Sequence, residues 1–345
     1  MRLKRQSLTL LIVLLGILLM IIWIPTNKAI VSPGEVRAAM DIGSGATNII
    51  VAKVDPKTDK IIAKIYSKSI AVPYQKHLES STDNTFDQIV MDQGIEAIKA
   101  LKQVANDYQA KKVIAVATAA FRQAANAEQF AKKIEAETGV QVRIINQDEE
   151  GILAFRGALA LTTANPENTI VWDIGGGSMQ LTSLSKEGTY LVEKGKTASI
   201  PFKNAVITQI KHQDIQSVQT PNPMTKEEMQ SAVKLASTKA KETDQAIITK
   251  LNDPQTTVLS VGNLFNYGVK PIVDNKVIKI DALENGVFAL AGKTDEQLGK
   301  GSLSEVAVTN PLLVLGYMKG LNIHQTEVVD VNNADGALTY PAYWN

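Results

Sequence analysis

Two glycine-rich segments, each opening on an aspartate, are the first residues whose types and spacing could do chemistry. They read Asp-Ile-Gly-Ser-Gly over Asp41–Gly45 and Asp-Ile-Gly-Gly-Gly-Ser over Asp173–Ser178. Glycine lets backbone N–H groups approach phosphate oxygens without interference from Cβ, so such turns form anion-binding concavities. An aspartate beside an apolar strand needs a partner, and a hydrated Mg²⁺ or backbone amides would serve. One such turn is more often an ordinary hairpin, but two in the same context predict a repeated phosphate-binding unit.

The two segments supply specific candidates for phosphate and metal binding. The expected phosphate-binding residues are Gly43, Ser44, Gly45, Gly175, Gly176, Gly177 and Ser178. The expected ligands of Mg²⁺ or Mn²⁺ are Asp41 and Asp173.

A pair of glutamates, Glu149 and Glu150, opens a predicted helix and is the next candidate for chemistry. In the first turn of a helix a carboxylate lies beside the positive helix end, and one of the pair could be held ready to accept a proton. Arg122 offers a planar fork that can bind two phosphate oxygens at once. Plainer interpretations exist, because acidic residues in a first turn are ordinary capping and an arginine can form a surface salt bridge.

The elements that must position these residues follow from the pattern of apolar residues. After Asp41 the chain turns through glycine into a second apolar segment, and an alternating segment follows, so three antiparallel strands are predicted in order. Helices then alternate with buried strands, and the first half reads βββαβαβα. The predicted strands are 36–40, 49–52, 60–66, 113–116 and 142–145, and the predicted helices are 87–108, 127–138 and 149–161.

The second half opens in the same way, and this repeat is the main organisational fact of the sequence. An apolar strand over 169–172 ends at Asp173 and is followed by a glycine turn. The other predicted elements are strands over 180–184, 190–193, 258–261 and 327–331, a long helix from near Thr225 to Leu251 that starts with a capping box, and a helix over 306–321. Because ligands bind at the carboxyl ends of such strands, the repeat predicts a cleft between two homologous lobes.

The amino-terminal residues indicate export. Basic residues within the first five positions precede an uncharged apolar run from Leu8 to Ile24, which ends at Pro25. The run is longer than a common signal core and at the short edge for a membrane-spanning helix, so a cleaved signal and a retained anchor both stay open. In either case the remaining residues are expected in a periplasmic or other extracytoplasmic space.

Composition narrows the domain organisation and the function classes. With 345 residues, 45% of them hydrophobic and 21% charged, the chain is expected to form two globular domains. A net charge of +1 without a basic stripe excludes a nucleic-acid-binding surface. There is no cysteine, and the three histidines lack metal-ligand spacing. The expected organisation is a signal peptide or anchor over residues 1–25, a tether over 26–37, an amino-terminal lobe over 38–164 and a carboxy-terminal lobe over 165–345.

With these motifs in this order, the sequence resembles the exopolyphosphatase/guanosine pentaphosphatase (Ppx/GppA) family. Besides the two phosphate loops, Ala117–Asn126 resembles the family's threonine-arginine-asparagine stretch, and Asp148–Gly151 with Gly157 resembles its glutamate-pair helix. The resemblance runs from about residue 36 to residue 337 and thins beyond Ser199. It implies an α/β fold of duplicated ribonuclease H-like lobes with mixed sheets, the fold of the actin-like ATPase superfamily.

The resemblance also implies an activity. It is the metal-assisted hydrolysis of terminal phosphoanhydride bonds in inorganic polyphosphate or pppGpp-like nucleotides. In the family the second glutamate of the pair activates water, so Glu150 is expected to be the base, with Glu149 beside it and Arg122 on phosphate oxygens. The expected partners are polyphosphate or a guanosine polyphosphate, and the membrane through the amino-terminal segment alone. A homodimer stays an open alternative.

Several residues depart from the pattern of the family. Gly45 and Ala46 stand where the family has asparagine and serine, which removes side-chain contacts from the first loop. Gln180 replaces a glutamate, which removes a negative group near the metal, and Thr339–Pro341 replace arginine, glutamate and glycine. These changes motivate an alternative, a catalytically weakened relative that binds polyphosphate, a nucleotide or a protein partner without turnover. They also lead us to expect that metal and phosphate are held mainly by the second loop.

Overall fold

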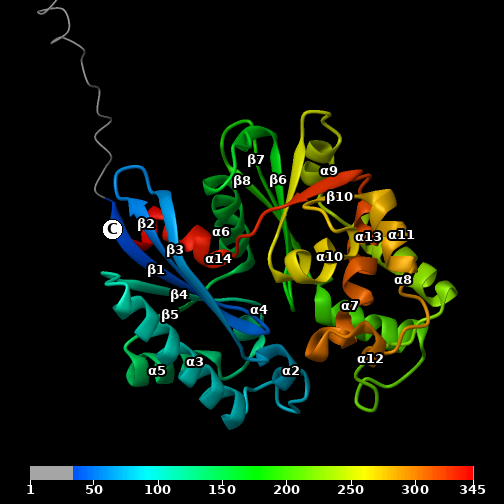
Figure 1. The fold of residues 1–345 in the computed structure, drawn as a ribbon, viewed down its shortest axis with the longest axis horizontal. Helices are drawn as coiled ribbons and strands as arrows, with labels where there is room; N and C mark the ends of the chain where they lie inside the picture. The colour runs from blue at the N-terminus through cyan, green and yellow to red at the C-terminus, as the bar shows by residue number, and fades with distance from the viewer. Residues whose placement is uncertain (1–33, 345) are drawn as a thin grey trace, which may run out of the picture. The chain divides into compact units, whose positions relative to one another are not determined.

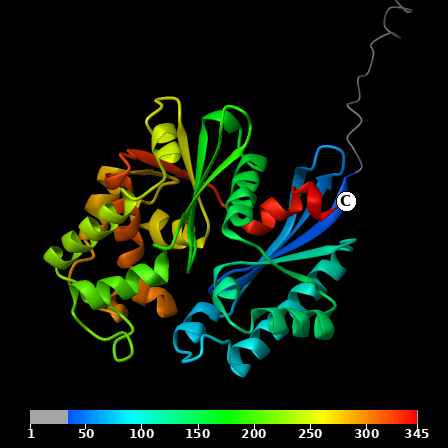
Figure 2. The same cartoon turned by 180° about the vertical axis from the view of Figure 1, so that it is seen from behind.

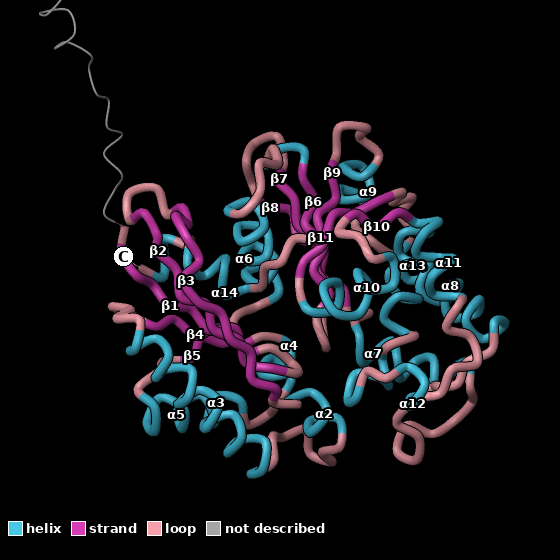
Figure 3. The backbone as a smooth tube through the Cα atoms, viewed as in Figure 1, coloured by secondary structure: helices cyan, strands magenta, loops and turns pink. Residues whose placement is uncertain are grey.

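Two mixed β-sheets organise residues 34–344, which are the residues that this computed structural model describes (Figure 3). The first sheet has the strand order β3-β2-β1-β4-β5. Its strands are β1 (Glu35–Ile42), β2 (Ala46–Asp55), β3 (Lys60–Ala71), β4 (Val113–Ala117) and β5 (Val142–Ile144). β1, β2 and β3 pair antiparallel in sequence order, whereas β4 runs parallel to β1 and β5 runs parallel to β4.

The second sheet repeats this topology and adds one edge strand, in the order β10-β11-β9-β6-β7-β8. Its strands are β6 (Thr169–Ile174), β7 (Met179–Leu184), β8 (Tyr190–Gly195), β9 (Thr257–Val261), β10 (Val277–Lys279) and β11 (Gln325–Val328). β6 pairs antiparallel with β7 and parallel with β9, as β1 does with β2 and β4. The predicted duplication and the α/β fold of ribonuclease H-like lobes are therefore confirmed.

Helices follow the strands in both halves. The helices of the first half are α2 (Tyr74–Glu79), α3 (Gln88–Asp107), α4 (Ala119–Gln123), α5 (Ala127–Thr138) and α6 (Gln147–Ala160). Those of the second half are α7 (Ser199–Ala205), α8 (Lys226–Ala240), α9 (Gln245–Leu251), α10 (Lys270–Val273), α11 (Ile280–Phe288), α12 (Asp295–Leu298), α13 (Thr309–Gly320) and α14 (Asn333–Leu338). Short helices of 3₁₀ or π type are η1 (Pro166–Asn168), η2 (Val206–Ile210), η3 (Leu264–Val269), η4 (Gly301–Val306) and η5 (Pro341–Tyr343).

The central strands bury both faces, which explains why they are continuous apolar runs. Every residue of β6 is buried, as are the last six residues of β1. Both runs end on an aspartate followed by isoleucine and glycine, so Asp41 and Asp173 lie at the carboxyl ends of the two strands. These ends are the edges at which sheets with crossover helices bind ligands.

Helix α6 lies between the two sheets, with α14 packed against it (Figures 1 and 2). Leu153 of α6 belongs to a core with strands of the first sheet, whereas Ala154 and Phe155 belong to a core with strands of the second. The close approach of α14 depends on glycine, because a Cβ at Gly336 would lie 2.0 Å from the carbonyl oxygen of Leu153. Although α14 follows the second sheet in sequence, it packs on β1, β2 and β4 of the first. The predicted boundary at residues 164 and 165 stays a prediction.

Some predicted elements are wrong in their bounds. The long helix predicted from Thr225 to Leu251 is two helices, because α8 ends at Ala240 and α9 begins at Gln245. Asp244 ends the continuity, since its side chain accepts from the Ala246 amide and its own amide donates to Glu193 Oε2 at 2.7 Å. The capping box at Thr225 is confirmed.

The end of the chain also differs from the prediction. The helix predicted over 306–321 begins three residues later, at Thr309, after the 3₁₀ segment η4. The last strand covers Gln325–Val328 instead of 327–331. Asn332 then caps α14, because its side chain accepts from the Ala334 amide. The extended segment ends at this cap.

The predicted export segment lies outside the described residues. This applies to the apolar run over residues 8–24 and to the tether up to residue 33. Within residues 34–344, no helix has the length and apolar character needed to cross a membrane.

Candidate functional site

The two glycine turns are closed by equivalent backbone hydrogen bonds. The amide of Gly43 donates to the carbonyl of Ala46 at 2.9 Å, and the amide of Gly175 donates to the carbonyl of Ser178 at the same distance. A helix that follows each hairpin then contacts its turn. The amide of Gln75 in α2 donates to Ser44 at 2.9 Å, and the amide of Ile200 in α7 donates to Gly176 at 3.0 Å. The predicted repeat therefore extends to the hydrogen bonds of both turns.

The turns lie directly against one another. A Cβ built on Gly176 would lie 2.7 Å from the Cβ of Ser44, and one on Gly177 would lie 2.9 Å from Oε1 of Gln75. At Gly176 only glycine permits this approach, because real Cβ atoms do not come so close to one another. A phosphate group can therefore lie between Ser44 and Gly176 only after the two turns separate.

Glu150 occupies the centre of a hydrogen-bonded cluster between the two sheets. Its Oε2 accepts from Arg122 Nη2 at 2.6 Å, from Gln180 Nε2 at 3.1 Å and from Ser178 Oγ at 3.2 Å. Arg122 Nη2 also donates to Ser178 Oγ at 3.1 Å, and its Nη1 donates to the carbonyl of Ile145. The cluster brings together one residue each from α4 and α6 and two from the hairpin of β6 and β7.

Local structure explains how Glu150 reaches this cluster. Asn146 caps α6 by accepting from the Glu149 amide at 2.8 Å, which fixes the first turn of the helix. Glu150, in that turn, is only 4% exposed. A Cβ on the next residue, Gly151, would lie 2.5 Å from Thr182 Oγ1. Glycine at this position therefore lets the helix come close to β7 and to the second turn.

At this site three buried carboxyl groups lie close enough to affect one another's pKa. Burial raises the pKa of Glu150, and the neighbouring Arg122 opposes the shift by its charge and its hydrogen bond. Burial also raises the pKa of Asp173 well above its usual value, with further contributions from the charges of Glu150 and Asp41. Burial and the Glu150 charge raise the pKa of Asp41 to about 7, although hydrogen bonds from Asn333 oppose this. With one guanidinium beside three buried carboxyl groups, the cluster favours the uptake of a proton or of a cation.

These carboxylates fit a divalent cation that keeps some of its own water. Asp41 Oδ1 is buried and lacks a hydrogen-bond partner among the described residues. Mg²⁺ is commonly held by one or two carboxylates, with water and substrate phosphates as the other ligands. Among residues 34–344, no group of three or more acidic, histidine or cysteine side chains is arranged as a complete metal cage. A metal at this site would have two protein carboxylates, Asp41 and Asp173, and would need water or phosphate oxygens as its other ligands.

Not every predicted site residue joins the cluster. Gly45 is exposed, and Ala46 has no side-chain donor, so the first turn offers backbone groups and Ser44. Glu149 points elsewhere, since its Oε1 accepts from the hydroxyl of Tyr343 at 2.6 Å. The predicted catalytic, phosphate-binding and metal-binding roles stay predictions, whereas Arg122, Glu150 and Ser178 are shown to lie together.

Two site residues were missed by sequence reasoning. Gln75 is buried, contacts both turns, and donates from Nε2 to Gln123 Oε1 at 3.3 Å, next to Arg122. Asn333 hydrogen-bonds Asp41 through its backbone and its side chain. Asn333 had a signal, because it follows the last predicted strand in a polar turn, whereas Gln75 had none.

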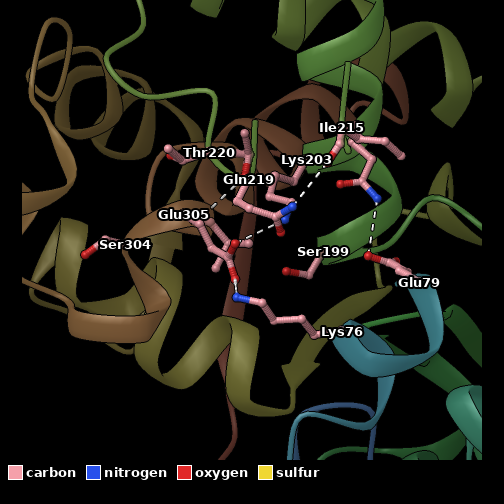
Figure 4. A network of polar contacts seen from close by, with 12 residues as sticks. Lys76, Glu79, Ser199, Lys203, Ile215, Gln219, Thr220, Ser304 and Glu305 are labelled. Atoms are coloured by element: carbon pink, nitrogen blue, oxygen red, sulfur yellow. Dashed lines mark hydrogen bonds and ion pairs between the residues drawn. The ribbon is translucent and has the colours of Figure 1, made fainter. Parts of the chain in front are cut away.

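A polar network joins α2 to α7 beside the turns (Figure 4). Glu305 of η4 lies between two lysines, 3.2 Å from Nζ of the buried Lys203 and 3.9 Å from Nζ of the exposed Lys76. Asn204 Nδ2 donates to Glu79 Oε2 at 3.4 Å. A small groove is lined by these side chains. Since α2 and α7 each hold one glycine turn, this network ties the two turns to one another.

Fold and site together define a two-lobed protein of the α/β class, with a buried carboxylate cluster between its glycine turns. Residues 50–260 match the model of the Ppx/GppA phosphatase family. Because this match covers more than half of the chain, the protein belongs to the Ppx/GppA phosphatase family and is a hydrolase of that family.

Solved structures share the fold at low sequence identity. A Ppx/GppA family member from Aquifex aeolicus is 18% identical and superposes with a TM-score of 0.69, over 89% of this chain and 97% of its own. An exopolyphosphatase from Cytophaga hutchinsonii is 15% identical, with a TM-score of 0.69 over 88% of this chain and 96% of its own.

A similar curated protein is longer than this chain. The bifunctional 3-dehydroquinate synthase/phosphatase of Fusobacterium nucleatum is 28% identical over 158 residues, which are 44% of this chain and 23% of that protein. The chain therefore spans about a quarter of the length of this relative.

Proposed function

We propose that this protein hydrolyses the terminal phosphoanhydride bond of inorganic polyphosphate or of a pppGpp-like guanosine nucleotide. The observation that carries the proposal is the buried carboxylate of Glu150, held between Arg122 and the second glycine turn. A buried carboxylate with a raised pKa is suited to accept a proton near neutral pH. Membership of the family and the resemblance to exopolyphosphatases support the substrate class.

The two oxygens of Glu150 have different contacts, which supports separate tasks for them. Arg122, Gln180 and Ser178 all donate to Oε2. Oε1 lies 3.5 Å from Ser178 Oγ and is the oxygen better placed to take a proton from water. The water oxygen would form a bond to the terminal phosphorus as the bridging P–O bond breaks. The shortened chain then leaves with the electron pair.

Substrate binding must redistribute the contacts of Arg122. In the structure its Nη2 is engaged with Glu150 and Ser178. Phosphate oxygens compete for the same guanidinium, and a weakened Arg122–Glu150 contact would make Glu150 a stronger base. A bound Mg²⁺ or Mn²⁺ would be held by Asp41 and Asp173 and would neutralise charge on the phosphate oxygens. Backbone amides of the turns would orient the phosphate.

We further propose that the protein is exported and works in a periplasmic or other extracytoplasmic space. The basic residues and apolar run at the amino terminus support this. Fractionation of the native cell would test it, since an anchored form is expected with the inner membrane and a cleaved form in the soluble periplasmic fraction. Recovery of the chain in the cytoplasm would contradict the proposal.

The proposed activity is tested by phosphate release from polyphosphate and from pppGpp, using the purified full chain with Mg²⁺. Replacing Glu150 by Gln (Glu150→Gln) is expected to lower the rate about 10²- to 10⁴-fold, because it removes the proton acceptor. Glu227→Gln, which changes an exposed first-turn glutamate of α8, is the matched control and should leave the rate unchanged. Equal rates for the wild type and Glu150→Gln would remove Glu150 from the mechanism.

A second candidate function is binding of a phosphate polymer without turnover. The loss of side-chain donors at Gly45 and Ala46 favours it, because fewer groups of the first turn are left to act on a bound phosphate. The amide of Gln180 in place of a carboxylate also favours it. Calorimetry with polyphosphate separates the two functions. Tight binding without phosphate release from either substrate would support this candidate, and release would exclude it.

A further inference from the structure

The first turn of α6 is tied to several parts of the molecule at once. Gln147 Nε2 donates to the carbonyl of Gly195 at 3.3 Å, and Asp148 forms an ion pair with Lys194 at 3.0 Å. Both contacts are made to β8 of the second sheet. Glu150, in the same turn, reaches Arg122 and the second glycine turn. Glu149, the remaining residue of the turn, makes its contact on the side away from the second sheet.

Tyr343 supplies the contact on that side. Its hydroxyl donates to Glu149 Oε1 at 2.6 Å, a distance typical of a hydrogen bond to an ionised carboxylate. Burial and this interaction with Glu149 raise the pKa of the Tyr343 hydroxyl, so Tyr343 remains a donor over the physiological range. Tyr343 is only 2% exposed, which excludes water as a competing partner for most of the side chain.

The end of the chain that carries Tyr343 is itself held by the first sheet. Lys112 Nζ donates to the carbonyl of Tyr343 at 2.6 Å, and the Arg143 guanidinium lies 5.2 Å from the centre of its ring. The Arg37 guanidinium lies 4.6 Å from the ring centre of Trp344, whose indole N–H donates to the carbonyl of Ala337. Cations over aromatic faces are attractive, so both contacts help to hold the two rings in place. The Tyr343 hydroxyl is therefore presented from a fixed platform.

We propose that Tyr343 is a positioning residue, which acts through Glu149 to hold the first turn of α6 and thereby sets where the carboxylate of Glu150 lies. The second sheet holds this turn through Gln147 and Asp148, and Tyr343 holds it from the first sheet. The turn is thus fixed between the two sheets at the place where Glu150 meets Arg122. This role rests on the proposed function of Glu150.

In this arrangement Glu149 has a different task from Glu150. Successive residues of a helix point about 100° apart, so two adjacent glutamates cannot share one site easily. Here one carboxylate faces Arg122 and the glycine turn, and the other faces Tyr343. We infer that Glu149 supports the site without contacting the substrate.

The test compares Tyr343→Phe with Tyr340→Phe in the full chain. Tyr340 is a matched control, since its ring lies 5.0 Å from that of Tyr343 and its hydroxyl makes no contact with the first turn of α6 among those described. Tyr343→Phe is expected to lower kcat for polyphosphate hydrolysis about tenfold with KM within about twofold, because a small displacement of the base acts on the transition state. Tyr340→Phe should leave kcat unchanged.

Two further measurements separate positioning from a general loss of structure. Glu149→Ala should lower kcat about as much as Tyr343→Phe, and the double variant should be no worse than either single variant, because both remove one contact. Hydrogen exchange of the amides over residues 147–151 should be faster in Tyr343→Phe than in Tyr340→Phe. This readout does not depend on activity, so it still tests the proposal if the wild type releases no phosphate, which would instead contradict the proposed function. Unchanged exchange, or additive losses of kcat, would overturn the positioning role.

Discussion

The two glycine turns have the same pattern of backbone hydrogen bonds but different side chains. In both, the glycine after Asp-Ile donates to the residue three positions on at 2.9 Å, and both aspartates sit opposite a polar residue of the neighbouring strand. Ser178 of the second turn contacts Arg122 and Glu150, whereas Ala46 at the equivalent position of the first turn has only a methyl group. The duplicated backbone therefore supplies amides twice, but the side-chain chemistry gathers on one copy.

The aspartates of the two hairpins also differ, in how far neighbouring groups favour their ionised form. Asn333 donates hydrogen bonds to Asp41 and partly offsets the cost of burying it. For Asp173 burial and two neighbouring negative charges all act against ionisation. Gly262 lies close by, and a Cβ there would be 2.9 Å from Asp173 Oδ1. Asp41 therefore has a protein partner that favours its ionised form, whereas every cause that acts on Asp173 raises its pKa.

The largest expected effect comes from replacing the aspartates one at a time. Asp173→Asn should lower phosphate release about 10²-fold or more, because a metal would lose its less compensated ligand. Asp41→Asn should cost about tenfold, since Asn333 already supports this position. Phosphate release at several Mg²⁺ concentrations, with calorimetry of Mg²⁺ binding, measures both. A larger loss from Asp41→Asn would reverse the proposed order of the two hairpins.

Exchanging the side chains of the turns gives a smaller effect. Ser178→Ala should lower phosphate release about tenfold, because it removes a hydroxyl that donates to the charged Glu150. Ala46→Ser, which places a hydroxyl at the equivalent position of the first turn, should change the rate less than about twofold, because Glu150 faces the second turn. Both substitutions are small and are measured in the same assay. Similar losses from both would show that the turns contribute equally.

The last expected effect concerns the pH dependence of stability in the absence of metal. Asp41 has a folded-state pKa of about 7 against 3.8 when exposed, so the folded protein binds this proton more tightly than the unfolded chain. The stabilising contribution is complete below about pH 4 and is lost as pH rises towards 7, with a slope of up to about 1.4 kcal/mol per pH unit.

Denaturant unfolding in a chelator measures this slope at several pH values. Asp41→Asn should flatten the dependence between pH 4 and 7, whereas Asp92→Asn, at an exposed carboxylate, should leave it unchanged. Added Mg²⁺ should reduce the loss of stability at neutral pH, because it favours ionised Asp41 and Asp173. A slope that is the same in the wild type and in Asp41→Asn would contradict the assignment of the proton to Asp41.

Local patterns in the sequence determined most of the fold and the candidates for chemistry. The apolar runs before Asp41 and Asp173 and the glycines after them predicted both hairpins, and the alternation of strands and helices predicted the repeat. These features are decided by neighbouring residues, since turns need glycine and central strands need apolar side chains on both faces. Glu150 and Arg122 could likewise be named, although only the resemblance to a family raised them above capping and surface pairing.

Only the tertiary structure decided how the candidates meet. No local signal places Glu150 within hydrogen-bond reach of Ser178, because they lie on different elements 28 residues apart. The different partners of Glu149 and Glu150 also depend on a distant contact, because Glu149 accepts from Tyr343, which is 194 residues away in sequence. The break between α8 and α9 likewise depends on Glu193, a partner far away in sequence. Contacts between distant segments depend on how whole elements pack, and one segment of sequence carries no record of that packing.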